Sequence, residues 1–280
     1  MPLLPADPAQ PNPSDRQTVL DALCFMQAPI NVTRLSELLS TQSTLRGATF
    51  NTNNLRGWLG ELLQAKQVGC NPQGQWWAVP ELSWPRFVAL VQQTASRERW
   101  WAAWRRLMQF DNSWHLELFG DEAMIGALRV VVYAGGTPEA FDRLCRLSRN
   151  VTPLQPGILA AALLRPFQPV LWDRLDPDLR YGLLVQLLRQ VGGDSESNTA
   201  PLWAWLQAQS RPDAGQLQEL PRLRLAERLL LSGQRDVPAA CCGAWTIQKP
   251  RRSARQPRLP TATTPAAPPP SSWPGKNRRR

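Results

Sequence analysis

The chain has 280 residues, and 32 Lys and Arg against 22 Asp and Glu give it a formal net charge of +10. Its single histidine excludes a multi-histidine metal site, its five cysteines lack C-x-x-C spacing, and a phosphate-binding G-x-x-x-x-G-K-S/T loop is absent. No basic start precedes an apolar run, and no apolar run approaches the roughly 20 residues that cross a bilayer, so we expect a cytoplasmic protein without membrane segments, metal or cofactor.

The positive charge is concentrated near the C-terminal end. Residues 237–280 hold nine Lys and Arg and no acid, which leaves 23 basic and 22 acidic residues in 1–236. The body of the chain is therefore nearly neutral, and an argument from net charge to nucleic-acid binding applies to the tail alone.

The first elements after a proline-rich leader are predicted to be helices. Residues 1–14, with five prolines in the first thirteen positions, are expected to be disordered. Apolar residues at helical spacing predict a helix over Asp15–Met26, a short second helix capped by Thr33, and a third helix over Thr52–Gln67. The inward residues are expected to be Leu35, Leu38 and Leu39 in the second helix and Leu55, Leu59, Leu62 and Leu63 in the third.

A small hairpin is predicted after the third helix. Val68–Cys70 and Gln75–Val79 have the pattern of strands, and Asn71–Gly74 between them has the composition of a turn. Three short helices followed by a hairpin is the element order of a winged helix. Residues 15–95 are therefore predicted to form a winged-helix-like domain.

The outward face of the third helix carries residue types that can read base edges. With Leu59 inward and about 100° per residue, the outward positions are Asn53, Asn54, Gly57, Gly60, Glu61 and Gln64, with Arg56 at their flank. Asn and Gln can pair with adenine and Arg with guanine, so the candidate nucleic-acid contacts are Arg46, Asn53, Asn54, Arg56 and Lys66. Three cations predict weak affinity and Glu61 would repel phosphate, so a winged helix that docks a protein is an equal alternative.

The Leu-x-x-Leu-Leu second helix at 35–39, the Leu-rich third helix and the Val-Gly … Gly-x-Trp-Trp hairpin at 68–77 resemble those of winged-helix domains. Over residues 15–235 the layout also resembles the N-terminal part of bacterial Swi/Snf-type helicase-like proteins, in which a winged helix and a long helical segment precede an ATPase motor. The resemblance implies DNA and a helicase-like ATPase as partners. The motor is absent from this chain, so any ATPase activity would come from another chain.

Residues 96–236 are predicted to form an α-helical domain. Gly-Gly pairs and Thr-Pro or Asp-Pro steps mark the ends of successive helices. The predicted helices are Arg97–Phe110, Asp121–Ala134, one that begins at Pro138 with Thr137 as its cap, Leu154–Leu164, Leu179–Val191, Leu202–Gln209 and a region from Gln216 to Leu231. Aromatic residues recur every 31 positions at Phe110, Phe141, Trp172 and Trp203, which leaves two architectures open: a bundle, which we favour, or a short helical repeat.

The predicted helix Arg97–Phe110 combines tryptophan with arginine, a pairing that also occurs where proteins stack nucleic-acid bases. On a helical wheel Trp100, Trp104 and their apolar neighbours share one arc, and most of the arginines lie outside it. We therefore predict that Trp100 and Trp104 are buried in the core rather than exposed for base stacking.

No catalytic constellation can be assembled from the sequence. His115 lies between apolar neighbours without a cysteine at ligand spacing, and we interpret it as structural. Asp121 and Glu122 begin a predicted helix, where negative charge interacts favourably with the helix dipole. We expect a protein that is not an enzyme.

Residues 237–280 are predicted to be a disordered tail. Nine prolines, many small residues and no acids cannot bury a core, and nine cations attract any polyanion. Two other interpretations stay open: a solubilising extension, or an out-of-frame end that makes the body the front fragment of a longer protein. The candidate phosphate-binding residues of the tail are Arg251, Arg252, Arg255, Arg258, Arg278, Arg279 and Arg280.

Two hypotheses about function follow. The first is a non-catalytic module that binds nucleic acid, or docks, within a helicase-like system, and the helix order at 15–80 favours it. The second is a protein-interaction or regulatory adaptor without nucleic-acid contact, which the near-neutral body favours. The first gains if Arg46, Arg56 and Lys66 converge beside the third helix, and it loses if Arg97–Phe110 covers the outward face of that helix.

Overall fold

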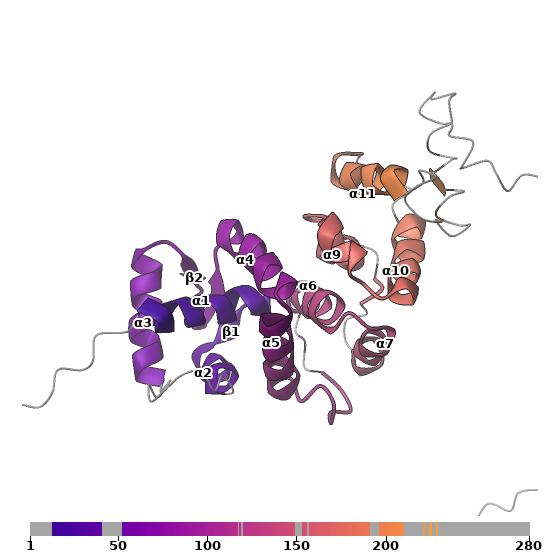
Figure 1. Cartoon of the computed structure of the whole chain (residues 1–280). Helices are drawn as coiled ribbons and strands as arrows, with labels where there is room; N and C mark the ends of the chain where they lie inside the picture. Colours follow the sequence, from indigo (N-terminus) through magenta and orange to yellow (C-terminus); the bar gives the residue numbers. More distant parts are fainter. Residues whose placement is uncertain are drawn as a thin grey trace, which may run out of the picture. The chain divides into compact units, whose positions relative to one another are not determined.

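The chain divides into two units, residues 1–243 and residues 244–280, and every residue that the computed structural model describes belongs to the first (Figure 1). The predictions for residues 1–12 of the leader, for Arg46, for most of Gln216–Leu231 and for the tail lie outside the described residues. The prediction that the leader is disordered as far as residue 14 is wrong at its end, because Pro13 and Ser14 are the first residues of a helix. The described part is mainly helical, and none of its helices is long and apolar enough to cross a membrane. The described residues are 13–40, 52–116, 118, 120–148, 153–155, 157–190, 196–209, 221, 224, 225 and 228.

The first half of the described chain combines helices with a small sheet. The three predicted helices and the predicted hairpin are present, and β1 and α4 are additional to the prediction. In chain order the elements are α1 (Pro13–Met26), β1 (Ile30–Asn31), α2 (Val32–Ser40), α3 (Thr52–Gln64), β2 (Val68–Cys70), β3 (Gln75–Ala78), α4 (Pro80–Gln92) and α5 (Thr94–Leu107).

The start of α2 differs from the prediction. Thr33 is not the cap, because the side-chain oxygen of Asn31 accepts a hydrogen bond from the backbone N–H of Arg34 at 2.8 Å. A side-chain oxygen that accepts from the third helical residue is the usual N-cap contact, so the helix begins at Val32. The inward leucines are buried as predicted: Leu35, Leu38 and Leu39.

α3 ends before the predicted Gln67 because its last turn closes in a Schellman motif. Lys66 has a φ of +55°, its N–H donates to the carbonyl of Leu63 at 2.9 Å, and the N–H of Gln67 donates to the carbonyl of Leu62 at 2.9 Å. The prediction that Leu63 faces inward is wrong, since 43% of it is exposed. The buried residues of α3 are Leu55, Trp58, Leu59 and Leu62.

The sheet has three antiparallel strands in the order β1–β3–β2. A turn closed by Asn71, whose side-chain oxygen accepts from the N–H of Gln75 at 2.9 Å, joins β2 to β3. A Cβ on Gly69 would lie 2.6 Å from the ring of Trp77, so only glycine fits beneath that ring. β1 has two residues, too few for an alternating pattern in the sequence, and it exists because it pairs with β3.

α4 and α5 pack on the N-terminal helices, α4 against α1 and α5 against α2 and α4, as Figure 1 shows for α5 beside α2. Trp100 and Trp104 are 0% and 1% exposed, so the prediction of core burial is confirmed. Trp100 stacks on Phe25 of α1 with ring centroids 5.8 Å apart. The helix ends at Leu107 rather than Phe110, since Gln109 has a φ of +48°.

From residue 121 onward the described elements are α-helices and one five-residue π-helix, η1. The single helix predicted over Asp121–Ala134 is wrong in its last turn, where η1 replaces α-helical hydrogen bonding. Thr137 caps α7 as predicted, because its side-chain oxygen accepts from the N–H of Ala140 at 3.3 Å. The elements are α6 (Asp121–Val130), η1 (Val131–Gly135), α7 (Pro138–Leu147), α8 (Ile158–Leu163), α9 (Pro169–Asp173), α10 (Pro177–Gln190) and α11 (Glu196–Gln209).

The later helices match the prediction unevenly. α8 is shorter than Leu154–Leu164, α9 is additional, and α11 begins six residues before the predicted Leu202, with Pro201 inside it. α10 begins two residues before the predicted Leu179, because the carboxylate of Asp176 accepts from the N–H of Asp178 at 2.9 Å. The predicted inward stripe of α10 is buried: Leu183, Leu184, Leu187 and Leu188.

The 31-residue aromatic spacing does not mark a structural repeat. Phe110 follows the end of α5, Phe141 lies within α7, Trp172 lies in the five-residue α9 and Trp203 lies within α11. The helices around these positions differ in length and order, so they do not form equivalent units. The buried residues form one hydrophobic cluster from α1 to α11.

Candidate functional site

The outward face of α3 is exposed as predicted. Leu55 and Leu59 are fully buried, which fixes the rotation of the helix, and Asn53, Asn54 and Arg56 are exposed on its other side. α5 packs against α1, α2 and α4, and the outward residues of α3 stay exposed beside it. Arg97–Phe110 therefore does not cover this face. Arg46 and the seven tail arginines lie outside the described residues.

The two described cations of the predicted site, Arg56 and Lys66, do not converge. Arg56 and Lys66 are both exposed, but ten residues separate them, which is about 15 Å along a helix axis. Lys66 lies in the Schellman turn that leads into β2, and Arg56 lies in the first half of α3. The positive charge is thus spread along the face rather than focused at one point.

The acid on this face has a partner that the sequence reasoning missed. Arg16 of α1 lies 2.9 Å from Glu61, measured from Nε to a carboxylate oxygen, and both side chains are close to half exposed. The pair offsets the negative charge of Glu61 on this face. An ion pair at this exposure contributes about 0–1 kcal/mol to stability.

Two glycines in α3 have no packing reason to be glycine. Gly57 and Gly60 lie three residues apart on the outward side, and a Cβ built on either would meet no atom within 4 Å. Glycine inside a helix costs about 1 kcal/mol relative to alanine. The cost has no compensation within the described chain, and it leaves a backbone surface that a partner can approach closely.

A second candidate site is a cavity of about 660 Å³ where the sheet, α4 and α6 meet. Trp77 and Trp84 line it with Pro29 and Pro166, so its walls are mostly aromatic and aliphatic. Cavities of this size and character are typical of ligand or peptide sites.

Arg129 forms one wall of this cavity. Its guanidinium donates to the carbonyls of Ala161, Ala162 and Arg165 at 2.7–3.1 Å and to the side-chain oxygen of Gln27 at 3.0 Å. Burial lowers the pKa of Arg129 from its ordinary value. These hydrogen bonds join α6 to the residue that follows α1 and to the end of α8, so the role of Arg129 is structural.

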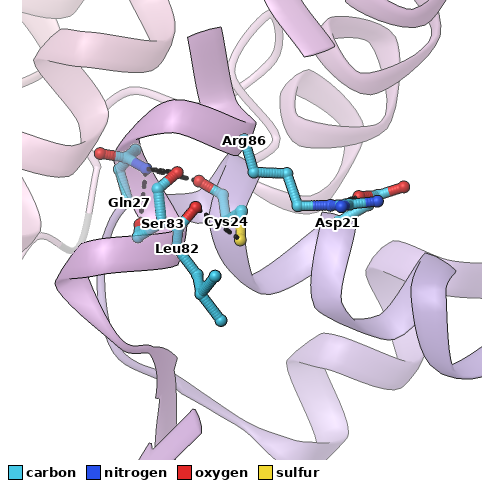
Figure 2. A network of polar contacts seen from close by, with 6 residues as sticks. All are labelled: Asp21, Cys24, Gln27, Leu82, Ser83 and Arg86. Atoms are coloured by element: carbon cyan, nitrogen blue, oxygen red, sulfur yellow. Dashed lines mark hydrogen bonds and ion pairs between the residues drawn. The ribbon is translucent and has the colours of Figure 1, made fainter. Parts of the chain in front are cut away.

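The polar network between α1 and α4 is also structural (Figure 2). Gln27 donates to the carbonyl of Cys24 at 2.6 Å and to the hydroxyl of Ser83 at 2.8 Å, and Arg86 forms an ion pair with Asp21. Burial raises the pKa of the Cys24 thiol to about 12, so a nucleophilic thiolate is not available at neutral pH.

The remaining candidates show no catalytic arrangement. His115 is exposed rather than packed among its apolar neighbours. Asp121 and Glu122 are exposed in the first turn of α6, the position expected for a helix-dipole role. Among the described residues, no three His, Cys, Asp or Glu side chains gather as metal ligands would.

Comparison with known proteins gives no match: neither a family model, nor a curated protein sequence, nor a solved structure is similar to this chain. The helix order and the face of α3 are therefore the basis for the functional argument.

Proposed function

We propose that residues 13–78 act as a winged-helix module that binds duplex nucleic acid without catalysing a reaction. The observation that carries the proposal is the outward face of α3, which is polar, exposed and bare of side chains at Gly57 and Gly60. The start of a recognition helix is the part that normally enters the major groove. Asn53, Asn54 and Arg56 lie at that start.

The other parts of the module have matching roles in this proposal. The two glycines let a sugar–phosphate backbone approach α3, and the β2–β3 hairpin serves as the wing. The cationic tail adds affinity that does not depend on base sequence. As the resemblance to Swi/Snf-type proteins suggests, an ATPase on another chain would supply any motor.

The α3 contacts can be tested by fluorescence anisotropy with labelled duplex DNA. The variant Asn53→Ala/Asn54→Ala/Arg56→Ala is expected to bind at least about ten-fold more weakly, because it loses two amides and one guanidinium that pair with base edges. Arg189→Ala, an exposed arginine on α10, is the matched control and should bind like the wild type. Equal affinity of all three proteins would contradict the role of α3.

The tail can be tested by a salt titration of residues 1–280 against residues 1–236. We expect a slope of roughly −3 to −6 in log K against log salt for the full chain, and a much shallower slope for the shorter one, since counterion release follows the number of neutralised phosphates. Unchanged slope and affinity after truncation would show that the tail is inert.

One observation favours the adaptor as a second candidate function. The 660 Å³ cavity has the aromatic and proline-rich walls that suit a peptide, and the body carries a net charge of +1 over residues 1–236. If neither protein in the salt titration binds DNA at low salt, the adaptor becomes the better proposal. Trp77→Ala, which removes a wall of the cavity, would then be the first variant to test for loss of a partner.

A further inference from the structure

Prolines recur at a constant spacing of three residues in the segment before α1. They are Pro2, Pro5, Pro8 and Pro11, and α1 begins at Pro13. Polyproline II has three residues per turn, so prolines at this spacing share one edge of such a helix. Its backbone makes no internal hydrogen bonds, which leaves the carbonyls available to a binding surface. The sequence before α1 therefore has the pattern of a polyproline II ligand.

The 660 Å³ cavity where the sheet, α4 and α6 meet has the surface that such a ligand requires. Proline-rich segments bind in grooves that are lined by aromatic side chains. Trp77 and Trp84 line this cavity, and a Cβ on Gly69 would lie 2.6 Å from the ring of Trp77. The ring is thus packed against the backbone of β2, and because Trp77 is only partly buried, a ligand can still reach it.

A buried hydrogen-bond donor in the wall of this cavity lacks an acceptor. Gln27 and Ser83 also line the cavity, and a hydrogen bond joins their side chains (Figure 2). Trp84 differs from them: it is 8% exposed, and its indole N–H has no hydrogen-bond partner among the described residues. A buried indole N–H usually has an acceptor. A carbonyl of a polyproline II segment would supply the missing group.

The segment before α1 is long enough to reach the cavity of its own chain. Leu23 and Gln27 of α1 line the cavity, and they lie 10 and 14 residues after Pro13, about 15–21 Å along the helix axis. Polyproline II advances about 3.1 Å per residue, so Pro5 and Pro8 lie about 15–25 Å along the chain from the start of α1. An Asn-Pro step, which favours a turn, stands at this start and allows the segment to run back beside α1.

The charges of the segment and of the cavity are complementary. Residues 1–12 contain one acid, Asp7, and no Lys or Arg. The charged residues that line the cavity are Arg129, Arg165 and Glu122, a net charge of +1. Arg165 is exposed. Asp7 lies six residues before α1, about 19 Å in polyproline II, which brings its carboxylate to the level of the cavity.

We propose that residues 1–12 bind as a polyproline II segment in the 660 Å³ cavity of their own chain. Pro5 and Pro8 then lie against the tryptophans of the cavity, and Asp7 lies beside Arg165. A cavity of this volume accepts a ligand of drug size, which corresponds to about one or two turns of the segment. A short tether gives an effective concentration of about 1 mM, so even a contact with a Kd of about 0.1 mM would be about 90% occupied. This contact does not depend on nucleic-acid binding by α3.

The proposal is tested by the binding of a peptide of residues 1–12, with a fluorescent label at its C-terminal end, to full-length proteins. Pro5→Ala/Pro8→Ala in the full chain removes the prolines of its own segment, so its cavity should take up the peptide. The wild type should bind the peptide about ten-fold more weakly, because its own segment competes. Fluorescence anisotropy measures both affinities. If the Pro5→Ala/Pro8→Ala chain does not bind the peptide, or if both chains bind it equally, the proposal is wrong.

Cavity variants in the full-length Pro5→Ala/Pro8→Ala chain locate the contact. Trp77→Ala should weaken peptide binding at least about ten-fold, because it removes an aromatic wall. Trp114→Ala is the matched control, since it removes a tryptophan that is 86% exposed and does not line this cavity, and it should leave peptide binding unchanged. Equal losses in the two variants would place the peptide elsewhere and overturn the proposal.

A charge exchange tests the same contact without removing a packed side chain. Arg165→Glu, at an exposed position of the cavity, should weaken binding of the peptide several-fold. A peptide with Asp7→Arg should bind the wild-type cavity weakly and should regain affinity for the Arg165→Glu protein. This pair keeps the proposal falsifiable if Trp77→Ala alters the circular dichroism spectrum. Absence of this recovery would contradict the proposed position of the segment.

Discussion

α3 and α5 are helices of nearly equal length. Their amino-acid compositions suggest that α5 carries a nucleic-acid surface and α3 does not, and the structure shows the reverse exposure. α5 holds three tryptophans and four arginines, the composition of a base-stacking surface, whereas α3 holds one arginine and two glycines. In the structure Trp100 and Trp104 of α5 are buried, and the polar face of α3 is exposed.

Two of the four arginines of α5 contact other residues of the same fold. Arg105 forms an ion pair with Asp111 at 2.7 Å, and its guanidinium lies 5.7 Å from the ring centre of Trp101. Arg99 covers the ring of Trp100 at the same distance. The periodicity of apolar residues therefore decides which helix can meet a partner, and the count of aromatic or basic residues does not.

The largest expected effect is the loss of stability when a buried tryptophan of α5 is removed. Trp104→Ala should lower the free energy of unfolding by about 3–5 kcal/mol, because it removes a fully buried indole. Its ring lies 5.5 Å from that of Trp101 and 5.4 Å from that of Phe110. Urea denaturation measures the loss. Trp114→Ala, which removes a tryptophan that is 86% exposed, is the control and should stay within about 0.5 kcal/mol of the wild type. Loss of DNA binding by Trp104→Ala without loss of stability would instead indicate that α5 contacts nucleic acid.

A second prediction contrasts a buried glycine of α6 with the exposed ones of α3. A Cβ on Gly126 would lie 2.7 Å from the carbonyl oxygen of Gln27 and 2.8 Å from the Cβ of Ala28, so α6 must move away from the segment that follows α1 to admit it. Overpacking costs about 1–3 kcal/mol of stability. The better helix propensity of alanine offsets about 1 kcal/mol of this cost. Gly126→Ala should therefore unfold at lower urea concentration than the wild type. A stabilised variant would mean that α6 and the segment after α1 are not held this close.

The sequence predicted the elements whose signals are local. The start of a helix with a clear cap is such a signal, and α7 begins at Pro138 with Thr137 as its cap, as predicted. The exposed face of α3 also followed from the position of Leu59, because one buried residue fixes the rotation of a helix.

Features that depend on distant partners could not be predicted in this way. β1 exists through its pairing with β3, and the end of α3 depends on the left-handed conformation of Lys66, a residue type that rarely adopts it. The partner of Glu61 comes from α1, 45 residues earlier, and no periodicity signals such a contact. The 660 Å³ cavity draws residues from α1, β3, α4 and α6 and is visible only once these elements are packed.

The third prediction concerns Gly57, where a substitution should raise the free energy of unfolding and a long side chain should weaken DNA binding. Gly57→Ala should raise the free energy of unfolding by about 0.5–1 kcal/mol, because alanine favours the helix and its Cβ meets no atom within 4 Å. Gly57→Gln should keep most of this gain and weaken DNA binding several-fold, since a long side chain stands where the proposal brings the nucleic-acid backbone. Urea denaturation and fluorescence anisotropy measure the two effects. If both variants bind DNA as the wild type does, the bare surface of α3 is not a contact.

The smallest expected effect concerns the ion pair beside the same face. Glu61→Gln removes a negative charge and releases Arg16, which then becomes available to a phosphate. Because the pair is close to half exposed, its loss should cost at most about 1 kcal/mol of stability. DNA affinity should rise about two- to four-fold, and the slope of log K against log salt should steepen by up to about 0.9, the value for one additional neutralised phosphate. Glu139→Gln on α7 removes the same charge away from α3 and should leave the salt slope unchanged. If both variants give the same slope, the charge of Glu61 does not act at the α3 face, and the adaptor function gains; if only Glu61→Gln steepens it, α3 is the face that meets the phosphates.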